Sequence, residues 1–147
     1  MLPERKTLPH GIPSWVASGA DYFITICTTP RGENQLCVAE QARNLKESLD
    51  FRQARGELWV HLLLFMPDHL HALISFSEQI GMKKSIADWK RYTSVQLGIG
   101  WQRDFFDHRL RKNEAYLEKA AYIRMNPVRA GLVASAEDWP YVWEQGR

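Results

Sequence analysis

The amino-acid sequence predicts an α+β fold: a ferredoxin-like antiparallel sheet with helices on one face and an added C-terminal helix. Strand-like and helix-like segments follow one another in the order β-α-β-β-α-β-α, which is the order of that fold plus one helix. Of the 147 residues 45% are apolar, enough to bury a core. We see no linker or repeat, so we expect a single domain over residues 1–147. Three prolines and two glycines indicate that residues 1–20 form an irregular arm.

The first half of the chain supplies two strands and the helix between them. β-branched and aromatic residues fill 21–28 and predict a strand. Residues 38–55 are predicted to form an amphipathic helix, and residues 58–65, which are nearly all apolar, a buried strand. The apolar residues at helical spacing are Val38, Ala42, Leu45 and Leu49. These three segments make up the first β-α-β unit.

A tight turn at Pro67 and Asp68 leads into the third predicted strand, 69–76. Because this connection is so short, the strand is expected to pair with the preceding one as an antiparallel hairpin. A helix is then predicted over 81–97. It begins at a glycine and is ended by the glycine-rich segment 98–100.

The last third of the chain is predicted to hold a short strand over 104–110 and a helix over 113–126. Asn113 suits the N-cap of this helix. Pro127 is expected to end it, because the residue before a proline disfavours the α conformation. The aromatic segment 139–143 is expected to fold back on the body of the protein.

Composition limits the cellular setting more than the partner. The net charge of +2 is too small to indicate nucleic acid by itself. Cys27 and Cys37 are the only cysteines, and no secretory signal is recognisable, so we expect reduced thiols rather than a disulfide framework. The longest apolar run is far too short to span a membrane. These features predict a cytoplasmic protein.

Two histidines separated by one apolar residue open the strand predicted over 69–76. Successive side chains of a strand point to opposite faces, so His69 and His71 share one face and Leu70 takes the other. Two neutral imidazoles on one side of a strand suit a divalent metal ion. The alternative is a pair of surface or hydrogen-bonded core histidines, and the motif alone favours that alternative.

A tyrosine in the last predicted helix changes this balance. Tyr122 and Asn126 are four residues apart and therefore lie on one helical face. Taken alone, Tyr122 is typical of an aromatic residue that packs on a sheet with its hydroxyl at the rim. Tyrosine is a poor nucleophile unless a metal, a base or a polarised electrophile assists it. A metal ion on His69 and His71 would assist by binding a phosphate as a Lewis acid, and Asn126 offers an amide oxygen as a third ligand.

Four short motifs, in this order, resemble those of one protein family. They are Pro67-Asp68-His69-Leu70-His71, Trp101-Gln102-Arg103-Asp104-Phe105-Phe106-Asp107-His108, Tyr122-Ile123-Arg124-Met125-Asn126-Pro127-Val128 and Asp138-Trp139-Pro140-Tyr141. Together they closely resemble the REP-associated tyrosine transposases, which belong to the HUH superfamily of single-strand DNA transposases and nickases. The resemblance extends from about Tyr22 to Tyr141, which is most of the chain.

The resemblance implies a ferredoxin-like core, a divalent metal ion (Mg²⁺ or Mn²⁺) and a C-terminal catalytic helix. By their places in the motifs, Tyr122 is the implied catalytic residue and His69 and His71 are the implied metal ligands. Asn126 is the implied third ligand. The related mobile-element transposases are similar but carry glutamine at this position. A site of two imidazoles and one carbonyl favours Mn²⁺ on physical grounds, with Mg²⁺ acting at higher concentration.

The implied reaction is a transesterification. The tyrosine attacks a phosphodiester of single-stranded DNA and gives a 5′-phosphotyrosyl enzyme and a free 3′-hydroxyl, and the reverse attack completes strand transfer. The implied partner is a hairpin from a repetitive extragenic palindrome, bound by a monomer or a homodimer at the nucleoid. Two alternatives stay open: a hairpin-binding or regulatory protein without turnover, and a metal-dependent phosphodiesterase in which activated water attacks.

Basic residues gather between positions 83 and 112, with eight Lys and Arg against three Asp, and others flank the tyrosine. Nearness to Tyr122 in the sequence favours phosphate contact over a solvated basic face. The predicted DNA-binding residues are Lys83, Lys84, Lys90, Arg91, Arg103, Arg109, Arg111 and Arg124. Weaker candidates are Arg5, Lys6, His10, Lys112 and Arg129 for DNA, Trp101 for base stacking, and Asp107 and His108 for a place near the site.

Overall fold

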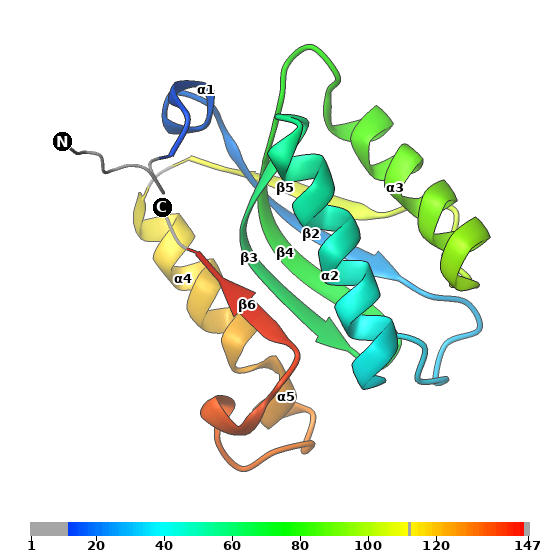
Figure 1. Cartoon of the computed structure of the whole chain (residues 1–147). Helices are drawn as coiled ribbons and strands as arrows, with labels where there is room; N and C mark the ends of the chain where they lie inside the picture. Colours follow the sequence, from blue (N-terminus) through cyan, green and yellow to red (C-terminus); the bar gives the residue numbers. More distant parts are fainter. Residues whose placement is uncertain (1–11, 112, 146–147) are drawn as a thin grey trace, which may run out of the picture.

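The computed structural model describes residues 12–111 and 113–145, and its centre is a five-stranded antiparallel sheet in the order β5-β2-β4-β3-β6 (Figure 1). The described strands are β2 (Asp21–Cys27), β3 (Leu58–Met66), β4 (His69–Phe76), β5 (Phe106–Leu110) and β6 (Val142–Glu144). The described helices are α1 (Ser14–Ala17), α2 (Ala39–Ala54), α3 (Met82–Leu97), α4 (Asn113–Arg124), α5 (Asn126–Arg129) and the 3₁₀ helix η1 (Ala136–Asp138). Without the short β6, this is the ferredoxin-like strand order, so the predicted fold class is confirmed.

The hairpin of β3 and β4 fixes where the two histidines lie. Met66 is opposite His69, so only two residues form the turn, as predicted. On its other edge β4 pairs with β2, where Thr25 is opposite His71. Because β4 is hydrogen-bonded along both edges, its first residues stand on a rigid part of the sheet.

Each face of the sheet carries its own apolar layer. Residues of α2 and α3 pack on one face, and residues of α4 pack on the other (Figure 1). The first layer includes Leu45, Leu49, Ile86 and Trp89 from the two helices. The second includes Tyr116, Ala120 and Ile123 from α4, against Phe23, Leu62, Leu64 and Leu73 of the sheet. The added C-terminal helix therefore covers the face that α2 and α3 leave open.

The prediction for the end of the last helix is wrong. α4 ends at Arg124, and a second short helix, α5, begins at Asn126. Pro127 lies in the first turn of α5, where its missing N–H costs nothing because first-turn N–H groups have no partner within a helix. The interruption therefore precedes the proline, and the proline begins a new helix instead of ending the old one.

Three other differences from the prediction exceed a single residue at an element boundary. The arm expected to be irregular up to residue 20 contains the helical turn Ser14–Ala17, and residues 1–11 lie outside the described part. β5 begins at Phe106, two residues later than predicted. The C-terminal aromatic segment does fold back, and Val142–Glu144 pairs with β3 as a strand that the sequence did not predict. Three residues are too few to show a period of two.

The two cysteines, Cys27 and Cys37, are free thiols in the structure. Burial raises the pKa of Cys37 to about 12, so this thiol stays protonated. Among the helices in the described part of the chain, none is long and apolar enough to cross a membrane.

A polar cluster is buried in the face that α4 covers. Ser75 Oγ donates a hydrogen bond to Asp21 Oδ1 at 2.8 Å and lies 2.9 Å from His61 Nε2. His61 Nε2 is in turn 3.1 Å from Asp21 Oδ1, and all three residues are buried. The serine hydroxyl therefore joins an acid and an imidazole that water cannot reach.

Ser75→Ala is expected to lower the free energy of unfolding by about 1–3 kcal/mol, because it removes a buried hydrogen-bond partner from both neighbours. Urea unfolding followed by tryptophan fluorescence measures the change. Ser94→Ala, on the exposed side of α3, is the matched control and should stay within about 0.5 kcal/mol of the parent. Equal unfolding midpoints for the two variants would contradict the structural role of the cluster.

Candidate active site

The two histidines that open β4 point to the face of the sheet that α4 covers. Their rings meet edge-on, with centroids 4.9 Å apart. His71 is buried, only 8% exposed, and stacks on the ring of Phe23 at 5.6 Å. His69 is partly exposed at the start of the strand. The alternation of the strand thus brings two imidazoles side by side at the edge of the buried layer.

One nitrogen of each imidazole already has a partner. His69 Nδ1 lies 2.9 Å from Asp68 Oδ1, and His71 Nδ1 lies 2.9 Å from Thr25 Oγ1. Arg31 Nε and the Gly32 N–H hold the same carboxylate at 2.9 and 2.8 Å. An ionised carboxylate can only accept, so the proton of neutral His69 lies on Nδ1. The second nitrogen of His69, Nε2, is then unprotonated. The Thr25 hydroxyl can donate or accept, so Nε2 of His71 is unprotonated when the hydroxyl accepts from Nδ1–H.

The electrostatic setting keeps these groups in the charge states that a metal ion needs. Burial, with smaller contributions from His69 and Arg129, lowers the pKa of His71 to about 3. The hydrogen bond from Arg31 holds the pKa of Asp68 below its usual range, with His69 and the Gly32 N–H adding to the effect. Near neutral pH, His71 is therefore uncharged and Asp68 ionised.

Tyr122 reaches this site from α4. Its ring centroid is 6.5 Å from that of His71 and 6.3 Å from that of Phe23. The tyrosine is 48% exposed, so one side of it packs on the site and the other faces solvent. The segment with His69 and His71 and the segment with Tyr122, some fifty residues apart in the sequence, therefore meet at one place. These are the two segments predicted to supply the metal ligands and the nucleophile.

Two cations lie over the Tyr122 ring. Arg129 Cζ is 4.1 Å and Lys119 Nζ 5.7 Å from the ring centroid. Arg129 Nη2 also donates to the carbonyl oxygen of Tyr122 at 2.7 Å. Positive charge thus lies close to the tyrosine ring, where it attracts an anionic group.

Asn126 stands at the start of α5, partly buried, and not within the same helix as Tyr122. In the described part of the chain no group of three or more His, Cys, Asp or Glu side chains is arranged to hold a metal ion. The imidazoles of His69 and His71, each held at Nδ1 by a neighbouring side chain, suit two positions of a metal site through Nε2. The role of Asn126 as a third ligand stays a prediction.

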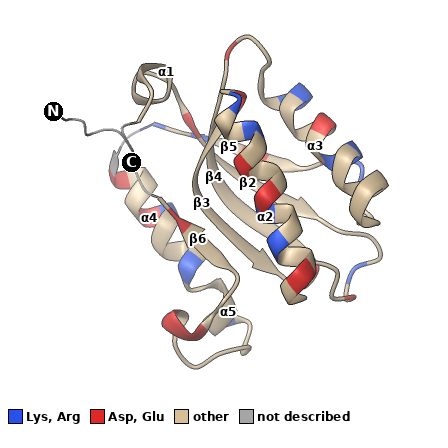
Figure 2. Cartoon of the chain, in the orientation of Figure 1, with Lys and Arg blue, Asp and Glu red and all other residues tan. Residues whose placement is uncertain are grey.

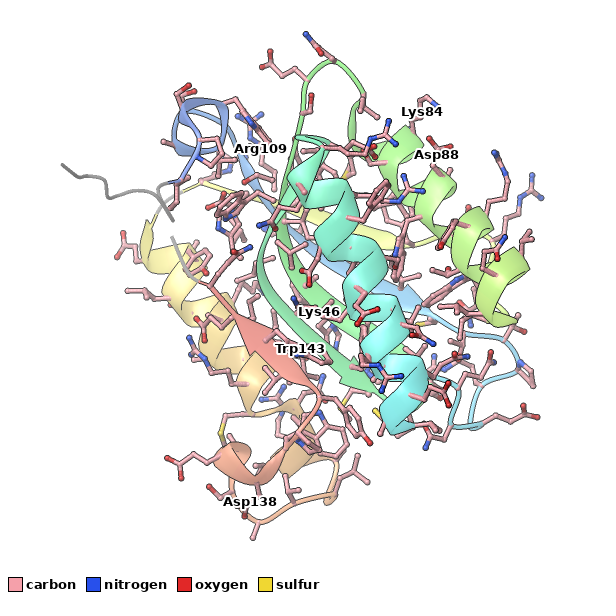
Figure 3. All side chains as sticks on the ribbon, in the orientation of Figure 1. Lys46, Lys84, Asp88, Arg109, Asp138 and Trp143 are labelled. Atoms are coloured by element: carbon pink, nitrogen blue, oxygen red, sulfur yellow. The ribbon has the colours of Figure 1, made fainter. Side chains whose placement is uncertain are left out.

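The basic residues of α3 do not lie near the tyrosine, because α3 packs on the face of the sheet opposite α4. Figure 2 shows that basic and acidic residues are interleaved on α2 and α3. Lys84 is bound to Asp88 at 2.9 Å, one turn along the helix (Figure 3). Lys83 and Arg91 are exposed. DNA binding by these residues stays a prediction. The nearness to Tyr122 on which that prediction was based is not found in the structure.

The other predicted DNA-binding residues lie in different settings. Arg103 and Arg111, which precede and follow β5 in the chain, are exposed. Arg109 lies near α1 in Figure 3 and lines a cleft with Trp15. Arg124 is bound to Glu144 of β6 by two hydrogen bonds of 2.9 and 2.6 Å. The weaker candidates Arg5, Lys6, His10 and Lys112 lie outside the described residues.

Two further predictions can be placed in the fold. The indole of Trp101 packs at 5.3 Å from that of Trp89, and its Nε1 donates to Thr93 Oγ1 at 2.9 Å. Asp107 is opposite Ile24 in the ladder and His108 opposite Phe23. Because opposite residues share a face, His108 lies on the face of the candidate site and Asp107 on the other.

Lys90 has a structural role that its charge did not reveal. Its Nζ donates to the carbonyl oxygens of Gln102 and Arg103 at 2.7 and 3.0 Å, and burial lowers its pKa. Lys90→Met keeps the aliphatic stem and removes both bonds, so we expect the free energy of unfolding to fall by about 1–2 kcal/mol. Thermal unfolding measures it, with Lys83→Met on the same helix as control. An unfolding temperature equal to that of the control would refute this role.

Several residues that the structure brings to the site were not predicted from the sequence. Thr25, Arg31 and Asp68 support the imidazoles, and Lys119 lies over the tyrosine. Only Asp68 carried a local signal, because it directly precedes His69 in the turn. The others come from distant segments and become neighbours only through the pairing of β2 with β4 and the docking of α4.

Comparison with known proteins finds relatives of the chain, although no protein-family model matches it. A REP-associated tyrosine transposase of Escherichia coli (strain K12) is 24% identical over 128 residues, covering 84% of this chain and 75% of that protein. A candidate REP-associated tyrosine transposase of Haemophilus influenzae is 28% identical over 147 residues, covering 84% of this chain and 78% of that protein.

A solved structure is similar over the same share of the chain. The structure of a REP-associated tyrosine transposase bound to a REP hairpin has a TM-score of 0.72 and 25% sequence identity, and the match covers 84% of this chain and 76% of that one. These comparisons confirm the resemblance that the four sequence motifs carry.

Proposed function

We propose that this relative of the REP-associated tyrosine transposases cleaves and rejoins single-stranded DNA at REP-type hairpins, with Tyr122 as the nucleophile. The observation that carries the proposal is the meeting of Tyr122 with His71, at 6.5 Å between ring centroids, on a face that also presents the second imidazole. A tyrosine that only packs against the sheet has no need of two imidazoles beside it. A tyrosine that attacks a phosphate does require such help.

The reaction exchanges one phosphodiester for another. The phenolic oxygen of Tyr122 attacks the phosphorus atom, the new bond joins phosphorus to the tyrosine oxygen, and the bond from phosphorus to the 3′-oxygen breaks. The phenolic proton leaves the tyrosine, and the departing oxygen becomes a 3′-hydroxyl. Because one P–O ester bond is formed for each one broken, a 3′-hydroxyl can reverse the step and join two strands without ATP.

His69 and His71 would hold a divalent metal ion, Mg²⁺ or Mn²⁺, with the amide oxygen of Asn126 as the proposed third ligand. When bound, the ion supplies Lewis-acid polarisation of the scissile phosphate. The surrounding residues prepare the two imidazoles for this role. Asp68 and Thr25 orient the two rings, and burial keeps His71 uncharged. Imidazole ligands favour Mn²⁺ over Mg²⁺, which prefers oxygen.

The proposed DNA partner follows from charge as well as from kinship. Lys119 and Arg129 lie over the exposed tyrosine, where a phosphate backbone would pass. The related solved protein is bound to a REP hairpin. We therefore propose that hairpin DNA lies against the exposed side of Tyr122 and α4.

Incubation with a single-stranded REP-type hairpin and Mn²⁺, followed by a denaturing gel, tests this function. If the tyrosine keeps the 5′-phosphate, a label at the 3′ end of the DNA travels with the protein and a label at the 5′ end appears in a shorter free strand. Mass spectrometry of the covalent band should find the nucleotide on the peptide that contains Tyr122.

Two other results would identify the alternatives. Cleavage of both labelled substrates without any covalent band would identify a phosphodiesterase that uses water. A band shift in a native gel without cleavage would identify a hairpin-binding protein.

A further inference from the structure

Arg129 makes two contacts with Tyr122 through one guanidinium group. Its Cζ lies 4.1 Å from the ring centroid, and its Nη2 donates to the Tyr122 carbonyl oxygen at 2.7 Å. The first contact is made with the face of the side chain and the second with the backbone of the same residue. A planar guanidinium can stack and donate at once, which an ammonium group cannot. One arginine therefore fixes both the ring and the backbone that carries it.

The interruption between α4 and α5 creates this arrangement. The last carbonyl groups of a helix lack backbone donors within that helix. α4 ends two residues after Tyr122, and the chain enters α5 through Met125. Arg129 ends α5, where its own N–H donates to the Met125 carbonyl at 2.9 Å. The short helix thus brings the Arg129 side chain back against the last turn of α4.

The remaining contacts of the Tyr122 ring are looser. Phe23 and His71 meet it edge-on, at 6.3 and 6.5 Å between centroids. Lys119 Nζ lies 5.7 Å away. The residue is 48% exposed, so packing restrains only one side of it. Among these aromatic and cation contacts, the one with Arg129 has the shortest distance to the ring centroid.

We propose that Arg129 is a positioning residue for Tyr122, which holds the ring in the orientation from which the hydroxyl meets the scissile phosphate. The inference rests on the proposed function. Misplacing a reacting group by about 1 Å costs about 10²-fold in rate. Arg129→Ala should therefore lower the rate of adduct formation at saturating hairpin by about 10²-fold. The Kd for the hairpin should change by less than about fivefold, the size of one exposed ionic contact.

Fluorine NMR of protein labelled with 3-fluorotyrosine tests the positioning directly and needs no activity. The chain has five tyrosines, and the Tyr122 signal is the one that Tyr122→Phe removes. Arg129→Ala should shift or broaden that signal and leave the other four in place, which also demonstrates that the variant is folded. Arg43→Ala, an exposed arginine on α2, is the matched control and should leave all five signals and the rate unchanged.

Arg129→Lys separates position from charge. Lysine keeps the positive charge but cannot stack and donate together, so the rate should stay close to that of Arg129→Ala. Full recovery by lysine, or a Tyr122 signal unmoved in Arg129→Ala, would overturn the proposal. If the parent protein forms no adduct with any hairpin, the proposed function fails, and the fluorine signal then still decides whether Arg129 orients the ring.

Discussion

Tyr122→Phe is expected to abolish the covalent protein–DNA adduct and to slow strand cleavage by a factor on the order of 10³ or more. Phenylalanine keeps the ring and removes the oxygen that forms the new bond. The contacts of Tyr122 with Phe23, His71 and Arg129 are made by its ring and its backbone, so the fold and hairpin binding should persist. A denaturing gel of the 3′-labelled hairpin measures the adduct, and a native gel measures binding.

Tyr92→Phe provides the matched control for this experiment. Tyr92 lies on α3, over the opposite face of the sheet, and is 47% exposed against 48% for Tyr122. The control variant should form adduct at the parental rate. If Tyr122→Phe also cleaved at the parental rate, the nucleophile would be water or another residue, and Tyr122 would be a packing residue.

His71→Ala is expected to weaken Mn²⁺ binding by more than about 100-fold, because loss of an outer partner of a ligand alone costs about 10–100-fold. Adduct formation should fall with it. The imidazole is buried and uncharged near neutral pH, so the substitution removes a proposed ligand and leaves no charge unpaired. Calorimetric titration with Mn²⁺ measures the affinity, and circular dichroism checks the fold.

Thr25→Val gives an intermediate test of the same site. It keeps His71 and removes the hydroxyl that lies 2.9 Å from Nδ1, so Mn²⁺ affinity should fall by about 10–100-fold. The expected order of affinity is parent, then Thr25→Val, then His71→Ala. Unchanged Mn²⁺ affinity in His71→Ala would show that the two histidines are structural and that the metal binds elsewhere or not at all.

The placement of the histidines could be predicted because two local rules determine it. A strand alternates its side chains, and a two-residue turn fixes the register of a hairpin, so the positions of His69 and His71 follow from a few neighbouring residues. The element order likewise gave the ferredoxin-like sheet, because few topologies accommodate it.

The partners of the histidines and the end of α4 could not be predicted in this way. Thr25 reaches His71 only through the register of β2 with β4, which is set by long-range packing. The interruption at Met125 depends on how α5 docks, and a proline is compatible both with the end of one helix and with the start of the next.

The basic residues of α3 show the limit of nearness along the chain as a guide. Lys83 and Lys90 are seven residues apart and so lie on one side of their helix, but this does not say which face of the sheet that helix covers. Right-handed crossovers put α2 and α3 on the same face, which leaves the other face to α4 and Tyr122. Nearness along the chain was therefore a poor measure of nearness to the tyrosine.

The strand order also limits the order in which the strands and helices can form during folding. Of the paired strands, β3 and β4 follow one another in the chain, whereas β2 must wait for partners as distant as Leu110, which is opposite Asp21. Hairpins close in microseconds, and distant pairings form more slowly because a long loop must first close. During synthesis the segment that carries both imidazoles thus leaves the ribosome before the segment with Tyr122. Tyr122 joins last, so a nascent chain does not yet carry the complete proposed site. Pulsed hydrogen exchange during refolding should accordingly protect the amides of β3 and β4 before those of α4.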